Sequence, residues 1–184
     1  LILVRNDSET LLIVTRDRGA AVVSRRRTPG GDCDFSYRVV QDLAPAKDGT
    51  IAYQLTRVPH VDPLGLLKNF RPELLAAYVD ETTWLHRTLD TPYPDSVVSL
   101  ARSVLWHPNI DKRAANVAPD VILTAQSGWF FGRQPTPGTM HGYPTQASMR
   151  ATWFLSGPGI RRASRLKTPC RLTDLTPTIL DLLQ

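Results

Sequence analysis

The run Glu9-Thr-Leu-Leu-Ile-Val-Thr15-Arg-Asp17-Arg-Gly19 is the first strong strand signal in the chain. Its centre is rich in apolar and β-branched residues, and it stops at an acidic residue and a glycine. This pattern predicts a buried strand over Leu11–Thr15. Open α/β sheets bind their ligands at the carboxyl ends of such strands. We therefore expect Asp17 to lie at a ligand-binding edge of a sheet.

Strands and helices are expected to alternate along the rest of the chain. Leu1–Arg5 has the pattern of the end of a helix, and the turn-forming Pro45–Gly49 joins two expected antiparallel strands. The further elements expected are strands at Phe35–Leu43, Thr50–Val58, Asp120–Ala125 and Trp153–Leu155, and helices within Glu73–Leu89, from Pro94-Asp95 onward and at Thr173–Leu183. This order predicts an α/β fold with a mixed or largely parallel sheet flanked by helices.

Composition limits the classes of function. The 184 residues carry a formal net charge of +5 and could form one domain with a sizeable core. The densest basic cluster, Arg25–Arg27, precedes the expected turn Thr28–Gly31 and lacks interleaved aromatic residues, so we expect a solvated loop and no specific nucleic-acid binding. No stretch reaches the roughly 18 consecutive apolar residues of a membrane helix. Cys33 and Cys170 form no zinc-binding CxxC motif, and their spacing leaves a disulfide undecided.

A second group of motifs lies near the C-terminal end of the sequence. Gly138-Thr-Met-His141-Gly-Tyr143 indicates a glycine-flanked loop that presents one imidazole, the commonest protein metal ligand. Met149–Ile160 then indicates a buried strand that ends in a tight turn, and Leu172–Leu183 indicates a terminal helix. This ordered series resembles the C-terminal signature of the alkaline phosphatase superfamily, closest to its type I phosphodiesterase/nucleotide pyrophosphatase branch.

The resemblance implies a three-layer fold and a metal site. Two divalent ions about 4 Å apart, usually zinc in this superfamily, would assist phosphoester hydrolysis, with His141 binding one ion and Asp17 the other. The family has Asp-His-Gly where this chain has Asp17-Arg18-Gly19. Arginine stays protonated and cannot ligate a metal, so the substitution removes one ligand. We expect Asp17 and His141 to converge at the same edge of the sheet.

Two functions follow from the resemblance. No segment matches the family's nucleophilic Thr or Ser, so residues 1–184 are expected to form the C-terminal part of a phosphodiesterase-like catalytic domain. The first function is a hydrolase that acts on a phosphoester-containing small molecule. The second is a catalytically degenerate homologue that binds a ligand or partner, and Arg18 favours it.

The other candidate residues have structural explanations. His60 and Asp62 stand between two prolines, which predicts a turn between elements more strongly than a pair of metal ligands. Asp174 precedes the last expected helix, where capping explains it better than ligation. The aromatic run Trp129–Phe131 either stacks on a base or sugar or forms a hydrophobic plug beneath the His141 loop.

Overall fold

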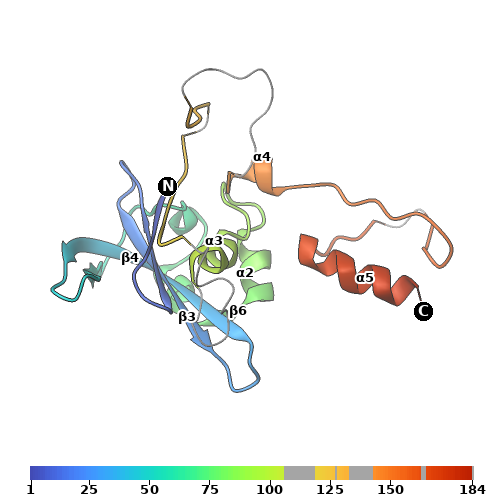
Figure 1. Ribbon diagram of the computed structural model, residues 1–184, viewed down its shortest axis with the longest axis horizontal. Coiled ribbons are helices and arrows are strands. Elements are labelled where there is room, and N and C mark those ends of the chain that lie inside the picture. Colours follow the sequence, from blue (N-terminus) through green and yellow to red (C-terminus); the bar gives the residue numbers. More distant parts are fainter. Residues whose placement is uncertain (106–118, 127, 133–142, 163–164, 184) are drawn as a thin grey trace. The chain divides into compact units, whose positions relative to one another are not determined.

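The computed structural model describes residues 1–105, 119–126, 128–132, 143–162 and 165–183 (Figure 1). The chain divides into two compact units, Leu1–Met149 and Arg150–Gln184. Within the described ranges, no helix combines the length and the apolar character needed to cross a bilayer.

The first unit is built on a sheet in which every described strand pair is antiparallel. The strand order is β5-β4-β3-β2-β1-β7, and the short β6 pairs with β4. The strands are β1 Ile2–Arg5, β2 Thr10–Val14, β3 Ala20–Arg27, β4 Cys33–Pro45, β5 Ile51–Leu55, β6 Val79–Asp80 and β7 Val121–Leu123. The structure is thus of mixed α/β class, but the expectation of a mixed or largely parallel sheet is wrong.

Short connections explain the antiparallel arrangement. β1 to β5 follow one another through segments that are only four or five residues long. Parallel neighbours need a crossover of roughly a dozen residues or more, so such short connections can only form hairpins. The expected antiparallel pair Phe35–Leu43 and Thr50–Val58 is confirmed as β4 and β5.

The first residues form a strand and not the end of a helix. β1 lies between β2 and β7, with Leu3 opposite both Ile13 and Ile122. A short apolar run cannot be assigned to helix or strand by its periodicity, and here two neighbouring strands satisfy its backbone groups. The expected strand Asp120–Ala125 is confirmed as β7.

The expected helix within Glu73–Leu89 is interrupted. The described helices of this unit are the 3₁₀ helix η1 Leu66–Lys68 and the α-helices α1 Pro72–Ala76, α2 Glu81–Thr88, α3 Ser96–Val104 and α4 Gln146–Met149. After α1 the backbone becomes extended at Ala77 (φ −65°, ψ 137°), and β6 then pairs with β4. Pairing along the edge of β4 therefore overrides the local helix preference. Pro72 in the first turn of α1 and the helix start at Pro94-Asp95 are both confirmed.

Asp80 begins α2 as its N-cap. Its carboxylate accepts hydrogen bonds from the Thr83 hydroxyl at 2.7 Å and the Thr83 backbone N–H at 2.9 Å. These two bonds, the hydroxyl bond first, lower the pKa of Asp80 below its ordinary value because they favour the charged form. The cap satisfies one of the backbone donors that the first turn of a helix leaves unpaired.

The main core lies between one face of the sheet and the helices. Alternate residues of β1 to β4 point to this face, where they meet side chains from α1, α2 and α3. Figure 1 shows α2 and α3 beside one another, and α3 contacts β1, β2, β3 and β4. The largest completely buried side chain is Trp84 of α2, whose indole Nε1–H donates to the Phe35 carbonyl at 2.8 Å.

The opposite face of the sheet carries a smaller core of Leu12, Ala20, Val22 and Val40. Ile51 and Tyr53 of β5 pack against it, although β5 and β2 are separated in the sheet by β4 and β3. The Ile51 backbone N–H also donates to Oδ1 of Asn6 at 2.6 Å. The sheet is therefore curved enough for the β4–β5 hairpin to reach the β1–β2 connection.

The second unit contains the 3₁₀ helix η3 Leu172–Asp174 and the helix α5 Leu175–Leu182. The terminal helix is thus confirmed. The expected buried strand Trp153–Leu155 is wrong, because no strand forms there among the described residues and Phe154 is 86% exposed. A strand needs hydrogen-bonding neighbours, which a three-residue apolar run does not itself provide. Asp174 is the N-cap residue of α5 but makes no side-chain cap bond to that helix; its carboxylate instead accepts from the Arg171 N–H at 2.8 Å, at the start of η3.

Candidate functional site

Asp17 lies in the exposed turn that joins β2 to β3. The Thr15 N–H donates to the Gly19 carbonyl at 2.9 Å, and the Arg18 N–H donates to the Thr15 hydroxyl at 2.9 Å. Gly19 adopts a left-handed conformation with φ 71°, which suits glycine in a tight turn. Arg16, Asp17 and Arg18 are all exposed.

The expectation that Asp17 follows a strand of an open, largely parallel α/β sheet is wrong. Both neighbours of β2 are antiparallel, so Asp17 is at the tip of a hairpin and not at the carboxyl end of a parallel strand. The rule that ligands gather where parallel strands end does not apply to this turn.

Arg18 extends from the turn toward the chain before η1. A Cβ atom added to Gly65 would lie 3.7 Å from the nearer Arg18 guanidinium nitrogen, so the guanidinium sits next to that glycine. In this turn, the single carboxylate of Asp17 is preceded by Arg16 and followed by Arg18. A divalent ion at Asp17 alone would meet more positive than negative charge.

The shared metal site of Asp17 and His141 is not described by the structure, because His141 lies outside the described residues. Among the residues that are described, no group of three or more His, Cys, Asp or Glu side chains is arranged to hold a metal ion. The described surroundings of Asp17 thus supply one candidate ligand and do not by themselves fit a bound zinc ion.

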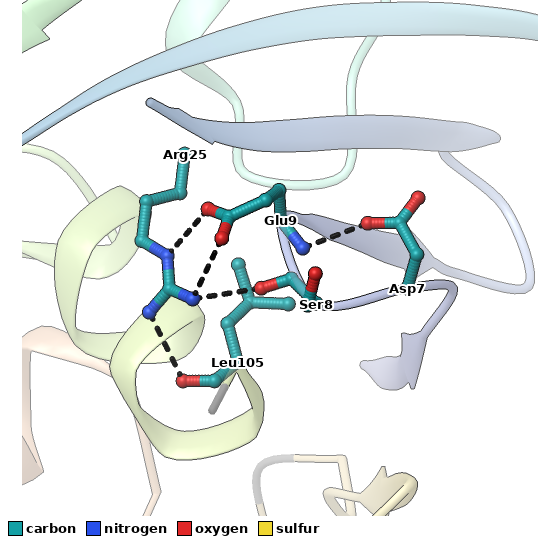
Figure 2. A network of polar contacts seen from close by, with 5 residues as sticks. All are labelled: Asp7, Ser8, Glu9, Arg25 and Leu105. Carbon is teal, nitrogen blue, oxygen red and sulfur yellow. Dashed lines mark hydrogen bonds and ion pairs between the residues drawn. The ribbon is translucent and has the colours of Figure 1, made fainter. Parts of the chain in front are cut away.

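Arg25 has a structural role that the sequence did not indicate. All three residues Arg25–Arg27 lie within β3, so the expectation that they form a loop is wrong, and the expectation of a solvated side chain is wrong for Arg25. Its side chain is only 8% exposed and pairs with the Glu9 carboxylate at 2.8 Å (Figure 2). It also donates to the backbone carbonyls of Ser8 at 2.7 Å and Leu105 at 3.3 Å.

The Arg25 contacts join the sheet to the end of a helix. Leu105 is the C-cap of α3, where unpaired carbonyls carry partial negative charge that a cation stabilises. The other two arginines of the cluster are exposed, and Arg26 pairs with Asp34 at 3.0 Å and lies over the Tyr78 ring at 4.5 Å. Of the three arginines, Arg25 is therefore buried and bonded to the end of α3, whereas Arg26 and Arg27 lie at the surface.

The turn expected at Thr28–Gly31 is confirmed by the bond from the Gly31 N–H to the Thr28 carbonyl.

A buried Tyr37–Asp62 pair is the second polar group that sequence reasoning missed. The Tyr37 hydroxyl donates to Oδ1 of Asp62 at 2.6 Å. The same carboxylate accepts from the backbone N–H groups of Leu66 at 3.0 Å and Leu67 at 2.9 Å, which begin η1. Burial, and then the nearby Asp62 carboxylate, raise the pKa of Tyr37 well above its ordinary value. The sequence feature that could have indicated this bonding is the position of Asp62, four residues before Leu66 at the start of an apolar helical turn.

This pair also decides the role of the His60 segment. Asp62 is buried with both carboxylate oxygens occupied, whereas His60 is exposed. The two side chains do not form a pair of ligands, and the expectation of a turn between elements agrees with the structure.

The other candidates lie at the surface. In the run Trp129–Phe131, Trp129 is 71% and Phe131 68% exposed, and the His141 loop against which a plug would pack lies outside the described residues. The Tyr143 hydroxyl donates to the Trp129 carbonyl at 2.7 Å. Cys33 is half-buried and Cys170 is exposed, and both are free thiols.

A small pocket opens at the outer edge of β4. It has a volume of about 180 Å³ and is mostly apolar. Its walls come from β4, from the end of β5 and from α1 and the residues before it: Tyr37, Arg38, Val39, Leu55, Thr56, Pro59, Leu67, Pro72, Glu73, Leu75 and Ala76. Sites for drug-sized ligands and cofactors usually measure about 300–1,000 Å³, so this pocket suits a smaller group.

Comparisons with protein-family models, with curated proteins and with solved structures found no match to this chain.

Proposed function

We propose that this chain belongs to a metal-dependent phosphoester hydrolase of the alkaline phosphatase superfamily, with a three-layer fold of the phosphodiesterase/nucleotide pyrophosphatase type. The observation that carries the proposal is the ordered series of the His141 loop, the Met149–Ile160 motif and the Leu172–Leu183 motif. The substrate is a phosphodiester or pyrophosphate, and the metal is zinc, held by His141 and Asp17. Imidazole and carboxylate are ordinary zinc ligands.

The second candidate is a catalytically degenerate homologue that binds an anionic ligand or a partner. Arg18 carries this alternative, because a guanidinium replaces the imidazole of the family at that position and repels a divalent ion. The same group, with Arg16 beside it in an exposed turn, suits a bidentate contact to a phosphate or carboxylate.

Zinc binding tests the first proposal. The 184-residue chain, dialysed against a limiting zinc buffer, should bind zinc through His141, and His141→Ala should reduce the bound zinc at least tenfold. His60→Ala is the matched control, since His60 is exposed and has no assigned ligand role. Equal zinc content in all three proteins, measured by elemental analysis, would exclude His141 as a ligand.

Replacing Arg18 separates the two candidates. Arg18→His should raise zinc occupancy, whereas Arg16→His, in the same exposed turn, should not. Neither protein should hydrolyse bis(p-nitrophenyl) phosphate, because the resemblance assigns the nucleophile to no residue of this chain. If Arg18→His leaves zinc binding unchanged while Arg18→Ala weakens binding of inorganic phosphate, the ligand-binding alternative is favoured.

A further inference from the structure

The second unit carries most of the net positive charge of the chain. Arg150–Gln184 contains six Lys and Arg residues and two Asp residues, which gives it four of the five net positive charges. Five of the basic residues lie in the run Arg161–Arg171, and no Asp or Glu lies between Asp120 and Asp174. Such an asymmetry of charge within a chain is typical of a protein that binds an anionic partner through its basic part.

The basic side chains of the run Arg161–Arg171 face solvent. Arg162, Arg165 and Lys167 are all exposed, and no helix or strand forms among the described residues of this run. The run leads directly into η3 and α5. Clusters of about four to eight basic residues next to an amphipathic helix are typical of segments that bind anionic lipids.

The helix α5 has an apolar face, which consists of Leu175, Ile179 and Leu182. These residues are four and three positions apart, so they lie along one side of the helix. Asp181 follows Ile179 by two residues, which places it about 200° around the helix. Asp174 precedes Asp181 by two helical turns and lies on the same side as it. The two acidic residues of the unit therefore lie away from the apolar face.

Packing within the second unit does not cover this apolar face. Ile179 is 43% and Leu182 41% exposed, and no described residue of Arg150–Gln184 is buried. A helix of eight residues is also too short to be stable in water without packing. An apolar phase that accepts the face would therefore stabilise the helix as well as bind it.

We propose that the second unit binds the surface of an anionic lipid bilayer. α5 lies along the interface with its apolar face toward the acyl chains, and the run Arg161–Arg171 contacts the phosphate headgroups. The charge of the run selects an anionic surface over a neutral one. The apolar face selects lipid over a nucleic acid, because a phosphate backbone offers charge without an apolar phase.

Cosedimentation of the 184-residue chain with vesicles tests this proposal. One set of vesicles is phosphatidylcholine alone, and the other also contains about one part in four of phosphatidylglycerol. In about 0.1 M NaCl we expect binding to the anionic vesicles to be at least about tenfold tighter, and about 0.5 M NaCl should weaken it by about tenfold through screening. Absence of binding to the anionic vesicles at the lower salt concentration would overturn the proposal.

Two charge-reversal variants test the basic run. Arg162→Glu combined with Arg165→Glu should weaken binding to the anionic vesicles by at least about tenfold. Lys47→Glu combined with Arg57→Glu is the matched control, because it changes the net charge equally at two exposed residues of the first unit. Equal weakening by both variants would overturn the proposal, since net charge and not the run would then determine binding.

Ile179→Gln tests the apolar face without changing the charge. It should weaken binding to the anionic vesicles by about tenfold, because a polar side chain then enters the acyl region. Val58→Gln is the control, since Val58 is a 67% exposed apolar residue of the first unit. Unchanged binding of Ile179→Gln would overturn the proposal and indicate attraction by charge alone. A lower urea midpoint of the first unit in Ile179→Gln would also overturn it, by indicating that this chain itself covers the apolar face.

Discussion

The two units of this protein differ in whether they bury their apolar side chains. In Leu1–Met149, side chains such as Leu11, Trp84 and Val97 are completely buried. In the described part of Arg150–Gln184, no residue is buried, although α5 and the residue after it contain five leucines and isoleucines. Apolar content therefore does not by itself produce a core.

Strand pairing and helix packing within the first unit account for this difference. Each of β1, β2, β3 and β4 pairs with at least two other strands, and helices cover one face of the sheet. α5 has eight residues, fewer than the roughly 12–15 at which an isolated helix becomes even marginally stable in water. Stability should therefore be concentrated in the first unit, and substitutions in the two units should have very different effects.

The largest effect is expected from Trp84→Ala. Trp84 is completely buried, and its indole bonds to the Phe35 carbonyl. Truncation leaves a cavity and removes this hydrogen bond, so the free energy of unfolding should fall by about 3–5 kcal/mol. Urea unfolding followed by circular dichroism measures this. A loss below about 1 kcal/mol would mean that the core of the first unit is not packed around this side chain.

Tyr37→Phe should cost about 1.5–3 kcal/mol, because it removes a buried hydrogen bond to a charged group. The effect should depend on alkaline pH. Since the folded-state pKa of Tyr37 is raised, the neutral hydroxyl stabilises the fold fully below the ordinary value of 10.0, and this contribution is lost as the pH rises above it.

Urea unfolding of the unmodified protein and of Tyr37→Phe, between pH 7 and pH 11, should therefore show their difference shrinking above about pH 10. Tyr53→Phe is the control, because the half-buried Tyr53 makes no side-chain hydrogen bond among the described residues. A difference that stays constant up to pH 11 contradicts a raised pKa for Tyr37.

Asp80→Ala should cost about 1 kcal/mol through loss of the α2 N-cap. The lowered pKa of Asp80 means that its stabilisation is present above the ordinary value of 3.8 and is lost as the pH falls through the lowered pKa. Thermal unfolding at pH 7 and near pH 2 should show a difference between the two proteins only at the higher pH. An equal loss at both pH values would indicate that the carboxylate charge is not involved.

The smallest effect is expected from Phe154→Ala in the second unit. Phe154 is 86% exposed, so its removal should change the free energy of unfolding by less than about 0.5 kcal/mol. The same urea experiment as for Trp84→Ala gives the comparison directly. A loss above about 2 kcal/mol would show that this phenylalanine is buried in solution, and the contrast between the units would then disappear.

Sequence reasoning identified the local turns and several element positions, but it misjudged the candidate site. It placed Asp17 just after a strand, and the residue does follow β2, in the turn to β3, but the strand was assigned to the wrong kind of sheet. It also treated Arg25 as solvated, since nothing in three consecutive arginines shows that one of them faces Glu9 and the end of α3. The part of the site that depends on His141 remains a prediction from the sequence.

The sequence by itself determined the features that depend on neighbouring residues. These include the hairpin at Pro45–Gly49, the helix starts at Pro72 and Asp95, and the terminal helix, because turn and capping preferences act over a few residues. Only the tertiary structure decided that Leu1–Arg5 is a strand, that β6 interrupts a helix and that Tyr37 meets Asp62. Those outcomes depend on hydrogen bonds and packing between segments distant in sequence, which local pattern cannot specify.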